Sequence, residues 1–101
     1  MRKGIKPRSR WEIILDILTV TFEEGTSGGH VKKTRIMQKA YLDWHNFQKY
    51  FDFLIGEGFI GNNENANGGK SYVLTEKGRD LKMRLNDVEG ILSTSTQSVI
   101  L

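Results

Sequence analysis

Residues 43–57 have the sequence DWHNFQKYFDFLIGE, and this stretch decides the fold of the 101-residue chain. Its apolar residues have the i, i+3, i+4, i+7, i+8 spacing that gathers side chains on one face of an α-helix: Phe47, Tyr50, Phe51, Leu54 and Ile55. The opposite face carries His45, Gln48, Lys49, Asp52 and Gly56. Asp43 can cap the first turn and Gly58 can end the helix. The spacing predicts a helix from Asp43 to Glu57 with one buried and one exposed face.

A helix is also predicted near the start of the chain. Ser9 and Glu12 have the spacing of a capping box, so this helix is expected from about Arg10 to Glu24. Its main apolar stripe consists of Trp11, Ile14, Leu15, Leu18 and Phe22. A second stripe lies roughly opposite and consists of Ile13, Ile17 and Val20. Because an apolar stripe is unfavourable in water, either another helix of the same chain or a second subunit must cover the second stripe.

A short helix is expected between these two, from about Lys33 to Ala40, after a glycine-rich loop at residues 26–30. Ile36 and Met37 are its expected buried pair, and Tyr41 with Leu42 forms the turn to the next helix. Thr34 can either cap this short helix or donate to a phosphate, and capping is the expected role.

The periodicity changes after Gly58. Two short strands, residues 59–62 and 71–74, flank a polar tract at residues 63–70, which predicts a hairpin with a long, mobile tip. Thr75 is expected to cap a final helix, in which apolar residues recur at intervals of 4, 3 and 4. These residues are Leu81, Leu85, Val88 and Leu92, which form a narrow seam of the coiled-coil type.

The order helix, helix, tight turn, longer helix, hairpin, helix predicts a mainly α (α+β) fold, the winged helix-turn-helix, with a two-stranded wing. The expected organisation is a basic arm at residues 1–8, the winged domain at 9–75, a dimerisation helix at 76–92 and a frayed tail at 93–101. The last helix is expected to form a dimeric coiled coil.

Three segments resemble a known family. They are residues 33–37 (KTRIM), residues 50–60 (YFDFLIGEGFI) and residues 72–79 (YVLTEKGR). In this order they are similar to the small archaeal winged helix-turn-helix DNA-binding proteins, a group that includes ArnR-like regulators and chromatin-associated proteins. The similarity covers about residues 9–85. It implies DNA binding and, from the chromatin-associated members, dimerisation through a C-terminal antiparallel coiled coil.

Charge is concentrated at the N-terminus. The chain has 15 Lys and Arg against 12 Asp and Glu, and five of the positive charges fall in the first ten residues, where no acidic residue occurs. An arm of this kind is suited to a polyanion, and its alternative role is that of a solubilising terminus.

Double-stranded DNA is the expected partner. The base-reading candidates are polar residues at the start and on the outer face of the third helix: His45, Asn46, Gln48 and Lys49. The phosphate-binding candidates belong to the arm, the second helix and the wing: Arg2, Lys3, Lys6, Arg8, Arg10, Lys32, Lys33, Thr34, Arg35, Lys39 and Lys70. For each base-reading candidate, the alternative is a solvated helix surface. Asp52 would be repelled by phosphates, so only the first two turns are expected to contact DNA.

The wing lacks the charge of a strong DNA-binding element. Four asparagines can form hydrogen bonds, Asn62, Asn63, Asn65 and Asn67, but Glu64 is the only charged residue before Lys70. The N-terminal arm is therefore expected to replace the wing in any reading of the minor groove.

A homodimer is expected, because two apolar surfaces need to be covered. The interface candidates are Ile13, Ile17, Val20, Leu81, Leu85, Val88 and Leu92. The alternative is that one of the two surfaces covers the other within a subunit.

Several classes of protein are excluded by the residue inventory. The chain has no cysteine, so it forms no disulfide and no cysteine-based metal site, and its two histidines have no obvious second ligand nearby. It contains no phosphate-binding loop, nucleophile elbow or zinc-protease motif, so neither an enzyme nor a cofactor is expected. Without an apolar stretch long enough to span a membrane, a cytoplasmic, nucleoid-associated protein is expected.

The competing hypothesis is a winged-helix module that binds another protein in a transcription complex. Trp44 and Phe53 lie off the core face of the third helix and could form its docking surface.

Overall fold

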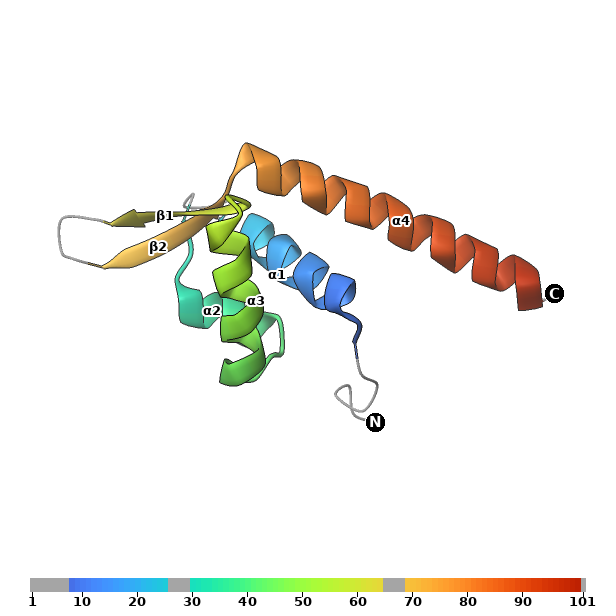
Figure 1. The fold of residues 1–101 in the computed structure, drawn as a ribbon, viewed down its shortest axis with the longest axis horizontal. Helices are drawn as coiled ribbons and strands as arrows, with labels where there is room; N and C mark the ends of the chain where they lie inside the picture. Colours follow the sequence, from blue (N-terminus) through green and yellow to red (C-terminus); the bar gives the residue numbers. More distant parts are fainter. Residues whose placement is uncertain (1–7, 26–29, 65–68, 101) are drawn as a thin grey trace.

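The structure is a computed structural model that describes residues 8–25, 30–64 and 69–100, with side chains described as far as residue 93. Its elements are α1 (Arg10–Gly25), α2 (Lys33–Lys39), α3 (Trp44–Gly56), β1 (Ile60–Glu64), β2 (Lys70–Leu74) and α4 (Glu76–Ile100). Helices α1, α2 and α3 lie together, the β-hairpin extends to one side of them, and α4 projects on the other side (Figure 1). The predicted winged helix-turn-helix fold is confirmed.

Helix α1 begins with the predicted capping box. The backbone N–H of Ser9 donates to Oε1 of Glu12 at 2.8 Å, and the backbone N–H of Glu12 donates to Oγ of Ser9 at 3.4 Å. Leu15, Ile17 and Leu18 are buried, because α1 packs against α2, α4 and β2 of the same chain. Buried Thr21 donates its hydroxyl proton to the carbonyl oxygen of Ile17, so no polar group is left unpaired at this point.

The burial of the two apolar stripes of α1 differs from the prediction. Ile17, assigned to the second stripe, is completely buried in the core, whereas Phe22 of the main stripe is 39% exposed. Of the two alternatives for covering the second stripe, the chain itself covers Ile17. Ile17 therefore cannot lie at a surface between subunits, and this interface assignment is corrected.

Helix α3 forms the centre of the core. A carboxylate oxygen of Asp43 accepts the backbone N–H of Asn46 at 3.2 Å, and Gly58, with φ of +83°, follows the helix end. Phe47, Phe51 and Leu54 are fully buried, as the apolar periodicity predicts. The ring of Phe51 stacks on Phe47 at 4.8 Å and meets Tyr72 of β2 edge-on at 4.9 Å, which joins α3 to the hairpin.

The hairpin is antiparallel, with Ile60 opposite Leu74 and Glu64 opposite Lys70. Each strand is longer toward the tip than predicted, and residues 65–68 at the tip itself lie outside the described residues. A third segment joins the sheet: Val31 and Tyr72 exchange two backbone hydrogen bonds of 2.8 Å. This bridge was not predicted, and it fixes the start of α2 against the wing.

Helix α4 starts close to the wing and ends far from it. Oγ1 of Thr75 accepts the backbone N–H of Gly78 at 3.0 Å, so the predicted cap is present. A methyl carbon at Gly78 would lie 2.0 Å from the carbonyl oxygen of Phe59, so only glycine permits this approach of the backbones. Leu81 and Leu85 then pack against the core, which makes the first half of α4 part of the winged domain.

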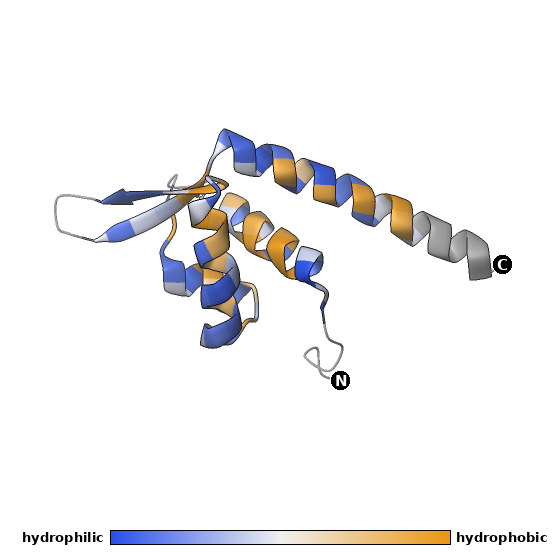
Figure 2. Cartoon of the chain, viewed as in Figure 1, coloured by the Kyte–Doolittle hydropathy of each residue, from blue (hydrophilic) through white to orange (hydrophobic). Residues whose placement is uncertain are grey.

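The second half of α4 differs from the first. Val88, Ile91 and Leu92 are 43%, 63% and 49% exposed, and Figure 2 shows apolar residues continuing along this part of the helix. The helix extends to Ile100, beyond the expected end at Leu92, so it includes residues 93–100 of the expected tail. Serine and threonine are moderate helix formers, and no proline or glycine interrupts this segment.

Candidate nucleic-acid interface

The helix-turn-helix unit consists of α2, a short turn and α3, and it leaves the outer face of α3 uncovered. His45, Lys49 and Asp52 are exposed on this face. In the turn, Tyr41 has φ of +56°, a left-handed conformation that is rare for a bulky residue, and its side chain is 75% exposed. The predicted amphipathic character of the helix at residues 43–57 is confirmed.

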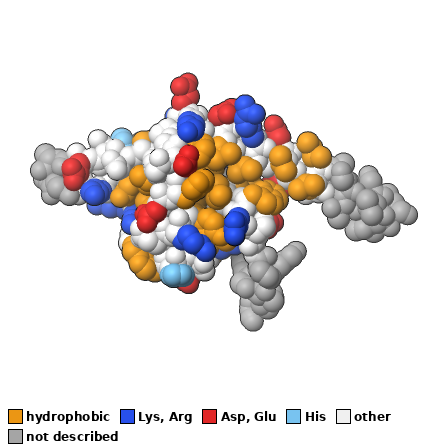
Figure 3. Space-filling view, in the orientation of Figure 1, with side chains coloured by type: hydrophobic (Ala, Val, Ile, Leu, Met, Phe, Trp, Pro, Cys, Tyr) orange, Lys and Arg blue, Asp and Glu red, His pale blue; other side chains and the backbone are white. Residues whose placement is uncertain are grey.

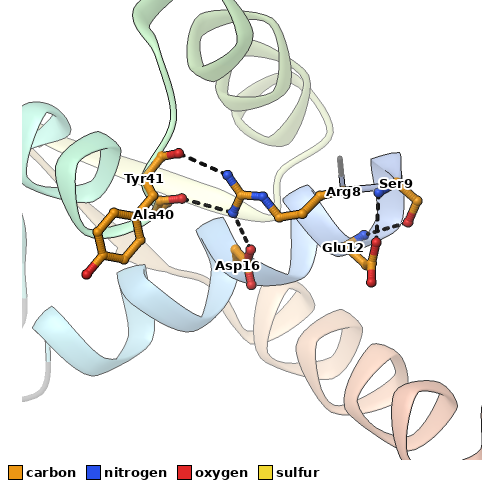
Figure 4. A network of polar contacts seen from close by, with 6 residues as sticks. All are labelled: Arg8, Ser9, Glu12, Asp16, Ala40 and Tyr41. Atoms are coloured by element: carbon orange, nitrogen blue, oxygen red, sulfur yellow. Dashed lines mark hydrogen bonds and ion pairs between the residues drawn. The ribbon is translucent and has the colours of Figure 1, made fainter. Parts of the chain in front are cut away.

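Arg8 holds this turn in place (Figure 4). Its Nη1 forms an ion pair with Asp16 of α1 and donates to the carbonyl oxygen of Ala40 at 3.0 Å. Its Nη2 donates to the carbonyl oxygen of Tyr41 at 3.0 Å. The guanidinium thus satisfies carbonyl groups at the end of α2 and ties them to α1. Arg8 was expected to bind phosphate from a basic arm; instead, it is engaged within the domain.

The four base-reading candidates divide into two pairs. His45 and Lys49 are exposed, with Nζ of Lys49 lying 5.1 Å from the ring centre of Tyr50. The other two candidates form hydrogen bonds within α3 and its cap. Nδ2 of Asn46 donates to Asp43 at 2.8 Å, and Nε2 of Gln48 donates to Asp52 at 2.7 Å. Each of these amide nitrogens has one N–H group engaged within the domain and a second N–H group that remains for a base.

The candidates on α2 divide in a similar way. Lys32, Thr34 and Lys39 are exposed. Lys33 is half-buried, with Nζ 5.0 Å from the ring centre of Trp44 and 5.5 Å from that of Phe51.

Arg35 has a partner on α1. Its Nε donates to Oε1 of Glu24 at 2.8 Å, and this hydrogen bond, aided by the positive charges of Arg35 and Lys39, holds the pKa of the Glu24 carboxyl below its ordinary value. Arg35 is therefore partly neutralised as a phosphate ligand.

Thr34 does not cap α2, contrary to expectation. The cap position belongs to Lys32, which makes no capping hydrogen bond through its side chain, and Thr34 lies inside the first turn. Helix α2 starts at Lys33, as expected, and the Val31–Tyr72 bridge fixes the backbone immediately before its cap Lys32.

The remaining phosphate candidates lie at the edges of the unit. Arg10 is exposed at the start of α1, and Lys70 is exposed at the start of β2. Arg2, Lys3 and Lys6 lie outside the described residues, as does most of the predicted arm.

The interface candidates lie on α1 and α4. Ile13 and Val20 are half-buried against the core, as are Leu81 and Leu85, whereas Val88 and Leu92 are exposed. In Figure 3, apolar side chains form a continuous area over the middle of the molecule and along the described part of α4. Among the described residues, the distal part of the predicted seam, Val88 and Leu92, is thus left exposed.

Two other kinds of feature are absent from the described part of the chain. Within residues 8–25, 30–64 and 69–100, no cluster of three His, Asp or Glu side chains could hold a metal ion. None of the helices described there is long and apolar enough to cross a membrane.

The fold and the uncovered face of α3 together define a winged helix-turn-helix protein. Residues 7–93 match the sequence model of the winged helix-turn-helix family, and the chain belongs to this family.

An uncharacterized protein of the archaeon Methanocaldococcus jannaschii is 41% identical over 87 residues, which cover 86% of this chain and 79% of the relative. Among solved structures, Sso10a-2, a DNA-binding protein from Sulfolobus solfataricus, has a TM-score of 0.70 at 26% identity, covering 91% of this chain and 93% of that one. The transcriptional regulator BldR of the same organism has a TM-score of 0.68 at 17% identity, covering 85% of this chain and 60% of that one, and it shares the fold.

Proposed function

We propose that this protein binds double-stranded DNA and acts as a non-enzymatic transcriptional regulator or a chromatin-associated protein. The observation that carries the proposal is the uncovered outer face of α3, with His45 and Lys49 exposed on it. In helix-turn-helix proteins this helix enters the major groove. The likeness to Sso10a-2, described as a DNA-binding protein, supports the same assignment.

Phosphate contacts would come from exposed cations beside α3. Lys32 and Lys39 of α2 and Arg10 of α1 are exposed, and no ion pair engages them within the described residues. Helix α2 crosses the DNA backbone in this docking mode, so its lysines are placed to neutralise phosphates. The wing would contribute less, since Glu64 lies opposite Lys70 on neighbouring strands.

A homodimer through α4 is part of the proposal. Val88, Ile91 and Leu92 leave the distal half of α4 with an exposed apolar surface, and a second copy of the same helix would cover it. Two-fold pairing would present two α3 helices to a site with matching symmetry. Sedimentation of the wild type and of a Val88→Asp, Leu92→Asp double variant tests this, since the charges should yield monomers.

The decisive test is selection of bound duplexes from a random pool at two salt concentrations. Enrichment of a palindromic site would support a regulator, and enrichment without a sequence pattern would support a chromatin role. The affinity for an enriched duplex should fall with salt, with a slope of about 0.9 in log–log units per phosphate neutralised. Lys32→Ala and Lys39→Ala should each reduce this slope by about that amount.

The matched control is Arg84→Ala. Arg84 is exposed on α4, where it pairs with Asp80 at 2.8 Å, and its removal should leave the slope unchanged. If the protein binds no duplex at low salt, the DNA-binding proposal fails. That result would favour the docking of a protein partner on Trp44 and Phe53, which are 53% and 48% exposed. Binding of the duplex with no salt dependence would instead overturn the proposed phosphate contacts.

A further inference from the structure

Trp44 occupies the first position of α3, directly after the capping residue Asp43. Its side chain is 53% exposed, although tryptophan is the largest apolar side chain in proteins. Side chains on a helix lean toward its N-terminus, so the indole lies over the end of α3 that would lead into the major groove. The exposed indole at the start of α3 is therefore available to contact a bound partner.

The indole is held in a defined position. Its ring centre lies 6.3 Å from that of buried Phe47, on the next turn of α3. On another side, Nζ of Lys33 lies 5.0 Å from the ring centre of Trp44. A cation–π contact and a buried aromatic neighbour both restrict rotation of the ring. Binding through Trp44 would therefore cost little side-chain entropy.

The polar residues near Trp44 are less available than the sequence indicates. The amide N–H groups of Asn46 and Gln48 are donated to Asp43 and Asp52, at 2.8 and 2.7 Å. Each amide keeps its second N–H group, but Oε1 of Gln48 is buried, so bidentate recognition of adenine by Gln48 would require its side chain to turn. Trp44 is the exposed large apolar residue in the first turn of α3.

We propose that Trp44 is a specificity-determining residue that contacts the 5-methyl group of a thymine in the major groove. This inference rests on the proposed DNA binding. The methyl group is the one apolar feature that the four bases present in that groove, and side chains recognise it by apolar contact. Lys33, next to the indole at the start of α2, supplies positive charge on the side of the DNA backbone.

The experiment replaces thymine by uracil, one position at a time, in a duplex selected by the wild-type protein. Uracil keeps every hydrogen-bonding group of thymine and lacks only the methyl group. The wild type should lose affinity about threefold to fivefold at one or two positions in each half-site, the effect of burying one methyl group. Replacing cytosine by 5-methylcytosine at such a position in a thymine-to-cytosine variant should restore part of the loss.

Trp44→Ala should bind the thymine and uracil duplexes equally, and Trp44→Phe should keep part of the discrimination. The matched control is Phe53→Ala, because Phe53 is similarly exposed on α3 but lies toward its other end. This variant should discriminate as the wild type does. Circular dichroism of each variant establishes that the helices are retained.

The outcomes separate the two proposals. If the wild type binds DNA but responds to no thymine-to-uracil replacement, the assignment of Trp44 is overturned and DNA binding stands. If Trp44→Ala is folded and still discriminates, the methyl contact belongs to another residue and the assignment is again overturned. If the wild type binds no DNA, the proposed function fails and this inference fails with it.

Discussion

The helix-turn-helix unit and the wing are held in place very differently. Arg8 links α1 to the α2–α3 turn by three interactions, and Phe47 and Phe51 of α3 are almost completely buried. In the hairpin, Ile60 and Leu74 are buried at the base and Tyr72 in the middle of β2, whereas residues 62–64 of β1 are exposed. The described part of the wing is therefore held mainly through these three residues.

This difference in packing fits the different tasks expected of the two regions. A helix that inserts into a groove must be preorganised, because a small error in its angle misplaces every contact that it makes. An element that follows the backbone can adjust, since phosphates are recognised largely by charge. The two regions meet at the contact between Phe51 and Tyr72. Substitutions at this contact, in the turn and on the wing should therefore have effects of different size.

The largest effect is expected for Phe51→Ala. Phe51 is 1% exposed and contacts both Phe47 and Tyr72, so its truncation leaves a cavity between the two regions. The free energy of unfolding should fall by about 3–5 kcal/mol, as measured by urea denaturation. Phe53→Ala is the control at an exposed site and should cost less than about 1 kcal/mol. Similar losses for the two variants would contradict the assignment of Phe51 to the core.

A smaller effect is expected for Arg8→Ala. It removes two hydrogen bonds to carbonyl groups and a partly exposed ion pair, so the free energy of unfolding should fall by about 1–2 kcal/mol. The affinity for DNA should fall at every salt concentration with an unchanged slope, because α3 is less well positioned and no phosphate contact is lost.

Arg10→Ala serves as the comparison for Arg8→Ala. Arg10 is exposed and belongs to the proposed phosphate contacts. Its variant should therefore keep the free energy of unfolding of the wild type, and the salt slope should fall by about 0.9 in log–log units. A reduced slope for Arg8→Ala would instead assign Arg8 to the phosphates.

The smallest effect is expected on the wing, for Glu64→Gln. Glu64 is exposed at the outer end of β1, and removal of its charge should change the free energy of unfolding by less than about 0.5 kcal/mol. Because repulsion from the DNA phosphates is reduced, the affinity for DNA at low salt should rise about twofold. Fluorescence anisotropy measures this affinity. Glu89→Gln on α4 is the control and should have no effect on binding. A loss of affinity in Glu64→Gln would show that the carboxylate makes a favourable contact.

Local patterns in the sequence predict most of the helices and strands. The capping box at Ser9, the cap at Asp43 and the end at Gly58 depend on neighbouring residues, and all three are present. The bridge between Val31 and Tyr72 joins residues far apart in the chain, so no local pattern reveals it. The extension of α4 to Ile100 is not predicted by local composition, because the serine and threonine residues near the end of the chain are also typical of a frayed helix end.

The candidate site is harder to predict than the fold. Composition identifies Arg8 and Arg35 as cations, but their partners Asp16 and Glu24 become apparent only when the helices are packed. Asn46 is exposed and Gln48 is half-buried on α3, and each has an acidic partner within one turn. The spacing of Gln48 and Asp52 is an i, i+4 pair, a signal in the sequence that could have indicated the second of these bonds.

Gly78 has a mechanical consequence. The backbones of α4 and Phe59 meet there without an intervening side chain, and 22 residues of α4 lie beyond this contact. At a rise of 1.5 Å per residue, tilting α4 by one degree about this contact would move its far end by about 0.6 Å. A methyl group at Gly78 would therefore change the direction of α4. In a dimer joined through α4, it would also change the distance between the two winged domains.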